Sequence, residues 1–159
     1  MGNSKTTVRQ LTVNAAFLKD IKDDNRDLKT LMDRIQPLRT PLPTALNHWP
    51  ELIRLFADLR DQLAMHFSLE EAYGYFDDAI VTAPQLNVTA ECLKGQHSVL
   101  FQQICELADR ALEVSADSEE QIEKFLNRFR QFEAELQKHE EAELKLILDA
   151  MDDDIGVGD

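Results

Sequence analysis

Two histidine–glutamate pairs with the same spacing are the residues in this chain most able to do chemistry. His66 and Glu70 form the first pair, and His139 and Glu143 form the second. Residues four apart lie on one face of an α-helix, so each pair presents an imidazole beside a carboxylate. This mixture of nitrogen and oxygen ligands suits iron, manganese or zinc, whereas calcium prefers oxygen alone. The two pairs therefore predict a metal site.

Both pairs lie on stripes of apolar residues at helical spacing, which predict buried helix faces. The first stripe consists of Leu52, Phe56, Leu59, Leu63, His66, Glu70 and Tyr73, and the second of Ile122, Phe125, Phe129, Phe132, Leu136, His139, Glu143, Leu146 and Ala150. A third stripe, from Ala90 to Ala111, contains His97. A carboxylate buried without a partner is costly, so these groups need either a complete hydrogen-bond network or a cation. We expect a metal, with a metal-free buried network as the alternative.

Helical periodicity and proline positions indicate how the chain places these stripes. We expect helices at about residues 12–36, 50–73 or 50–76, 89–114 and 118–151, with a proline-containing linker at 37–49. Residues 1–11 read as a flexible arm and residues 152–159 as an acidic tail. The predicted fold is all-α, an up-down-up-down antiparallel four-helix bundle in one domain at 12–151. Asn25 interrupts the apolar stripe of the first helix.

Composition excludes several classes of partner. The net charge of −13 opposes binding to nucleic acid and to anionic membrane surfaces. No window approaches the roughly 18 apolar residues of a membrane span, and the first ten residues lack a secretory signal, so we expect a cytoplasmic protein. Cys92 and Cys105 fall in one predicted helix, too far apart for a disulfide, and we interpret them as packed thiols.

The order His-x-x-x-Glu, single His, His-x-x-x-Glu on three successive helices resembles the hemerythrin-like family, also called the HHE cation-binding domain. The segments His66-Phe67-Ser68-Leu69-Glu70-Glu71 and His139-Glu140-Glu141-Ala142-Glu143 are similar to its two signature segments, and the resemblance covers about residues 12–151. It implies a non-haem di-iron centre whose two ions share an oxo or hydroxo bridge. Glu70 and Glu143 would bridge the ions, and His66, His97 and His139 would be terminal ligands.

One position departs from the family pattern. The family's first histidine lies in a helix 1 segment of the Asp-His-Arg kind, and Asn25 takes its place in Asp23-Asp24-Asn25-Arg26-Asp27. The departure implies an asymmetric or more open site, completed by Asn25, a water or Tyr73. We interpret Asn25 as a hydrogen-bond donor beside the metal, with a weak ligand or a lost ligand as alternatives. Iron is expected, with a single ion, manganese or zinc as alternatives, and Glu71, Glu140 and Glu141 are expected on solvated faces.

The resemblance implies that the protein binds or senses dioxygen or a related small ligand such as nitric oxide. One alternative is enzymatic chemistry of peroxide or nitric oxide at the same centre, or delivery of iron for iron–sulfur repair. Another is an interaction bundle whose metal site has degenerated, beginning with Asn25. The sequence leaves the physiological ligand and the oligomeric state open.

Overall fold

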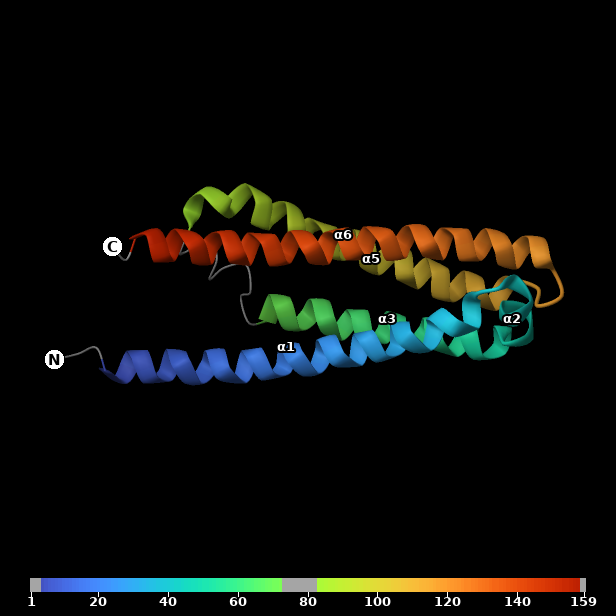
Figure 1. The fold of residues 1–159 in the computed structure, drawn as a ribbon, viewed down its shortest axis with the longest axis horizontal. Helices are drawn as coiled ribbons and strands as arrows, with labels where there is room; N and C mark the ends of the chain where they lie inside the picture. The colour runs from blue at the N-terminus through green and yellow to red at the C-terminus, as the bar shows by residue number, and fades with distance from the viewer. Residues whose placement is uncertain (1–3, 73–82, 158–159) are drawn as a thin grey trace.

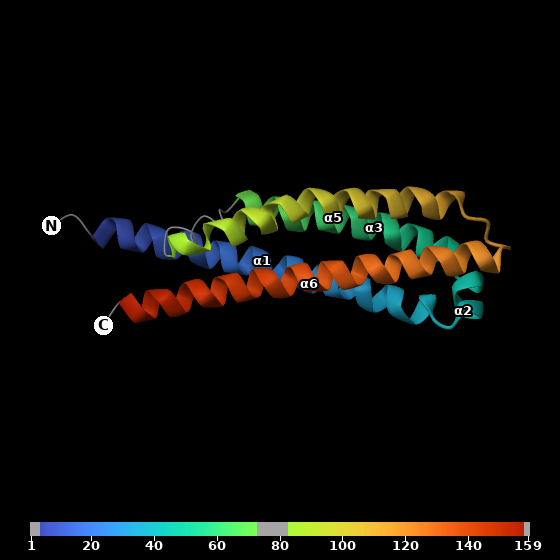
Figure 2. The ribbon, with the colours of Figure 1, turned by 90° about the horizontal axis from the view of Figure 1, so that it is seen from above.

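The computed structural model describes residues 4–72 and 83–157, and within these ranges every regular element is helical. The elements are α1 (Ser4–Arg39), α2 (Leu42–Asn47), α3 (Trp49–Ala72), the short 3-10 helix η1 (Pro84–Leu86), α5 (Asn87–Glu113) and α6 (Glu119–Val157). The four long helices lie lengthwise beside one another, with α2 at one end and both termini at the other (Figure 1). A view from above shows the same arrangement (Figure 2). The all-α prediction is confirmed.

The helix count differs from the prediction because the expected linker at 37–49 contains α2. Pro41 precedes this helix and Pro43 lies in its first turn, where a missing backbone N–H costs nothing. Prolines there start a helix as readily as they prevent one. Pro37 also lies inside α1, which continues to Arg39.

The expected arm and tail are largely helical. The first helix, α1, begins at Ser4, within the segment expected to be flexible, and α6 ends at Val157, within the expected acidic tail. Ser118 caps the start of α6, where its Oγ accepts a hydrogen bond from the Gln121 backbone N–H. None of the described helices is long and apolar enough to cross a bilayer.

The main hydrophobic core lies toward the α2 end of the molecule. Its centre is aromatic: the Trp49 ring meets the Phe125 ring edge-on at 5.2 Å, and Phe56 lies 5.0 Å from Phe125 and 4.9 Å from Phe129. Aliphatic residues predicted from the stripes surround them, all buried: Leu52, Leu59, Leu63, Leu100, Ile104, Ile122 and Leu136. This packing fixes the rotation of α3, α5 and α6, and so determines where their polar residues point.

Arg39 joins the end of α1 to α6. Its guanidinium donates to both carboxylate oxygens of Glu133, at 2.6 and 2.9 Å, and to Gln36 Oε1 at 2.5 Å. It also lies over the Phe129 ring, 5.4 Å from its centre. Arg39 is buried, so its charge depends on these partners.

Candidate metal centre

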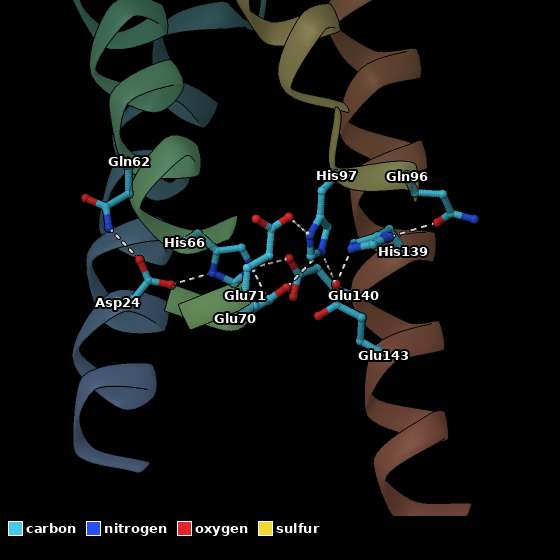
Figure 3. Close-up of polar contacts among 10 residues, drawn as sticks. All are labelled: Asp24, Gln62, His66, Glu70, Glu71, Gln96, His97, His139, Glu140 and Glu143. Carbon is cyan, nitrogen blue, oxygen red and sulfur yellow. Dashed lines mark hydrogen bonds and ion pairs between the residues drawn. The ribbon is translucent and has the colours of Figure 1, made fainter. Parts of the chain in front are cut away.

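The five residues predicted to face the core come together in one buried cluster. His66 and Glu70 come from α3, His97 from α5, and His139 and Glu143 from α6; each is only 2% or 3% exposed. Figure 3 shows their side chains pointing toward one another between α3 on one side and α5 and α6 on the other. The expected burial of all five is confirmed.

The Nε2 atoms of the three histidines converge on the two glutamates. His66 Nε2 lies 2.8 Å from Glu70 Oε1. His97 Nε2 lies 2.9 Å from Glu70 Oε2 and 3.1 Å from Glu143 Oε1. His139 Nε2 contacts Glu143 Oε1. Glu70 and Glu143 thus lie between imidazoles supplied by three different helices.

The Nδ1 atoms of the same histidines point outward, each to its own oxygen. His66 Nδ1 donates to Asp24 Oδ2, and Asp24 Oδ1 accepts a 2.8 Å hydrogen bond from Gln62 (Figure 3). His139 Nδ1 donates to Gln96 Oε1 at 2.8 Å, and His97 Nδ1 lies 3.4 Å from Glu71 Oε1. A proton held on Nδ1 leaves the Nε2 lone pair free to bind a metal.

Two overlapping sets of four ligand atoms could each hold an ion. One set comes from Glu70, His97, His139 and Glu143, and the other from His66, Glu70, Glu140 and Glu143; within each set the atoms lie within 4.8 Å of one another. Both sets contain Glu70 and Glu143. Two neighbouring ions could therefore share these two carboxylates.

The donor set fits metal ions better than it fits a closed hydrogen-bond network. Glu70 Oε2 and His139 Nε2 are buried and have no hydrogen-bond partner in the described part of the chain, although other cluster atoms lie close to both. Buried polar atoms without a partner are costly. Four buried or half-buried carboxylates, on Asp24, Glu70, Glu140 and Glu143, also gather around His66 and His97, and two divalent cations would balance their charge.

The cluster shifts the protonation of its own members. Burial alone would lower the pKa of His66, but hydrogen bonds with Asp24, Glu140 and Glu70 raise it to about 12. Burial likewise opposes the charge on His97, whose pKa the two glutamates raise to about 9. Burial would raise the pKa of Glu70, but the adjacent imidazoles of His66 and His97 lower it to about 2. Burial raises the pKa of Glu143, and the charges on Glu70 and Glu140 add to the increase.

Leu28, Met32 and Ile35 of the first helix pack into the core as predicted, but the placement of Asn25 on the buried face is wrong. Asn25 is exposed, whereas its neighbour Asp24 is 3% exposed and contacts His66. Asn25 still lines a cleft of about 340 Å³ that reaches His66, Glu70 and Glu143 from the surface. Its role beside a cofactor stays a prediction, and Tyr73 lies outside the described residues.

Sequence reasoning missed four residues that contact the cluster: Asp24, Glu71, Gln96 and Glu140. Glu140, expected on a solvated face, is only 34% exposed, and its carboxylate lies 2.7 Å from His66 Nε2. Spacing could have indicated this, since Glu140 precedes Glu143 by three residues and so shares its side of the helix. Glu71 is 60% exposed, as expected, yet reaches His97. Glu141 is exposed as predicted.

Apolar groups enclose the cluster along the helix axis. Phe67 stacks on His97 with ring centres 4.5 Å apart, on the side of the main core. A second, smaller apolar cluster of Ala90, Leu93 and Leu146 lies beyond the site. The polar cluster thus lies between two clusters of apolar residues, and the cleft beside Asn25 reaches it from the surface.

Comparison with known proteins identifies the family. The model of the hemerythrin HHE cation-binding domain matches residues 16–151. The chain belongs to this family. The matched segment contains every member of the cluster, so the buried histidines and glutamates occupy a hemerythrin HHE cation-binding domain. No curated protein and no solved structure matches the chain.

Proposed function

We propose that this chain binds two iron ions that share Glu70 and Glu143 as bridging ligands. His66 would bind one ion, and His97 and His139 the other, within an up-down-up-down antiparallel bundle of the four long helices. The proposal rests on one observation: the Nε2 atoms of three histidines lie close to the carboxylates of Glu70 and Glu143. The paired sets of ligand atoms support two positions.

The function that this site supports best is binding or sensing of dioxygen or nitric oxide. The ions, when bound, would supply an open coordination position and the electrons for such a ligand. The chain's own residues hold the ligand atoms in place through Asp24 and Gln96, and Phe67 keeps one side apolar. The cleft beside Asn25 and Leu144 would admit a small molecule from solvent.

Metal content tests the proposal directly. Elemental analysis of aerobically purified protein should give about two irons per chain, with near-ultraviolet charge-transfer bands of a bridged ferric pair. The Glu143→Gln variant should lose the irons and the charge-transfer bands, because Glu143 belongs to both sets of ligand atoms. Glu141→Gln, on the same helix, is the matched control.

Other outcomes would overturn the proposal in different ways. One metal per chain would replace the di-iron site by a mononuclear one. No metal after anaerobic reconstitution with ferrous iron would favour an interaction bundle. Turnover of hydrogen peroxide or nitric oxide by loaded protein would favour an enzyme, whereas a spectral change that reverses when dioxygen is removed supports binding.

A further inference from the structure

We infer that Glu140 is a metal ligand and that it makes the two ion positions chemically different. The inference rests on the proposed function. It concerns the position beside His66, for which α3 supplies one imidazole and the shared glutamates supply carboxylate oxygens. A fourth ligand atom at that position comes from Glu140 on α6.

Neither Asp24 nor Asn25, on the first helix, points a free ligand atom there. Both oxygens of Asp24 are engaged, Oδ2 with His66 Nδ1 and Oδ1 with Gln62 Nε2. Asn25 is exposed. Asp24 is therefore a positioning residue that fixes the His66 ring and does not itself coordinate the ion.

Glu140 meets the requirements of that ligand. Its Oε1 lies 2.7 Å from His66 Nε2, the atom that faces the ion position, and its side chain is 34% exposed at the inner end of the cleft. Glu70 Oε1, in the same set, lies 2.8 Å from the same His66 Nε2. A cation between His66, Glu70 and Glu140 would balance the charge of these carboxylates and reduce their mutual repulsion.

The two positions would then differ in chemistry. The position beside His97 and His139 offers two imidazoles and the two shared carboxylates. The position beside His66 offers one imidazole and three carboxylates, because Glu140 is added to the shared pair. Oxygen-rich positions favour harder ions, so the Glu140 position should accept Mn²⁺ readily as well as Fe²⁺. It also lies at the cleft, where a small ligand would arrive first.

The test counts bound ferrous ions rather than activity. Wild-type protein, Glu140→Gln and Glu141→Gln would each be dialysed anaerobically against Fe²⁺ of known free concentration. We expect two ions in wild type and in Glu141→Gln. Glu140→Gln should keep one ion with unchanged affinity and bind the second at least tenfold more weakly. Circular dichroism would check that all three chains keep the same helix content.

Each alternative result identifies which proposal fails. Two ions bound by Glu140→Gln with wild-type affinity would mean that Glu140 only pairs with His66, and would overturn the inference alone. If Glu141→Gln weakened binding of the second ion equally, the effect would come from loss of surface charge, and the inference would also be overturned. No iron in wild type would overturn the proposed function itself.

A second substitution separates the positions. His139→Ala should weaken the imidazole-rich position and leave one ion beside His66. Adding Glu140→Gln to that chain should then abolish Fe²⁺ binding. Persistence of one tightly bound ion in the double variant would overturn the assignment of Glu140.

Discussion

At the scale of single residues, both ring nitrogens of His66, His97 and His139 have a partner. Each histidine has one nitrogen turned toward the glutamates and the other held by an outer oxygen. The outer oxygens belong to Asp24, Glu71 and Gln96, none of which follows the His-x-x-x-Glu spacing. Partners of this kind orient the ring and increase its basicity toward a metal.

Removing the outer partner of His66 tests this effect. Asp24→Ala should weaken metal binding at the His66 position about 10- to 100-fold, because the ring loses the acceptor that fixes its orientation. Asp23→Ala is the matched control, since Asp23 makes only a surface pair with Arg26 among the contacts described. Equilibrium dialysis would measure the affinity. Equal affinities in the two variants would show that Asp24 does not position the ring.

The protonated histidines make the metal-free protein sensitive to pH. The raised pKa values of His66 and His97 stabilise the folded state fully below about pH 6.5, their ordinary value, and this stability is lost as pH rises through about 9 for His97 and about 12 for His66. The lowered pKa of Glu70 acts oppositely, so its contribution is lost only as pH falls from about 4.5 toward 2.

Urea unfolding of metal-free protein should therefore show falling stability between pH 6.5 and 9. The loss should be of the order of 2–3 kcal/mol per pH unit, because about two bound protons, one from each of these histidines, are released on unfolding. Metal-loaded protein should show a smaller loss, since the ions replace those protons. A metal-free protein that is more stable at pH 9 than at pH 6.5 would contradict this assignment of charges.

At the scale of the helices, apolar stripes predicted three of the four long elements well. The stripe residues of α5 and α6, and those of α3 up to Glu70, are buried or partly buried as expected, because many large apolar residues fix the rotation of each helix. The first helix lacked such information near the site. Asp24 and Asn25 both fit between Ile21 and Leu28 at helical spacing, and both are polar.

The choice between them is made by tertiary contacts. Asp24 forms hydrogen bonds with Gln62 and His66, and the sequence pattern of residues 12–36 does not indicate these partners. The short helix α2 escaped prediction for a different reason: prolines suit the start of a helix as well as a linker. Helical spacing predicted that His97 and the two histidine–glutamate pairs are buried, but it did not predict the partners that neighbouring helices supply.

The ion pair between α1 and α6 should contribute to stability. Glu133→Gln removes the main partner of a buried guanidinium and should lower the free energy of unfolding by about 2 kcal/mol, less than for a fully buried pair because Glu133 is 29% exposed. Glu135→Gln, an exposed change on the same helix, should have little effect. Urea unfolding would measure both. Equal effects would show that Arg39 is satisfied without Glu133.

At the scale of the whole molecule, the two ends are stabilised differently. The α2 end contains the aromatic core around Trp49 and Phe129. Beyond the metal site, the apolar packing reduces to small clusters such as Ala90, Leu93 and Leu146. Bound ions would join α3, α5 and α6 there, so metal should add more to local than to global stability.

Hydrogen exchange would reveal the difference. Removing metal with a chelator should speed amide exchange most around Ala90–His97 and Glu143–Ala150, while residues near Phe56 and Phe125 keep most of their protection. The segments near Phe56 and Phe125 serve as the internal control. A uniform increase along the described helices would indicate that the site and the core unfold as one unit.

The position of Trp49 has a practical consequence for such experiments. It is the only tryptophan in the chain, and it lies buried against Phe56 and Phe125, within the aromatic core. Its fluorescence therefore reports on the α2 end, whereas circular dichroism averages over all helices. Without metal the two signals should give separate unfolding midpoints, and with metal they should coincide. A fluorescence curve alone would record an intact protein whose other end had already opened.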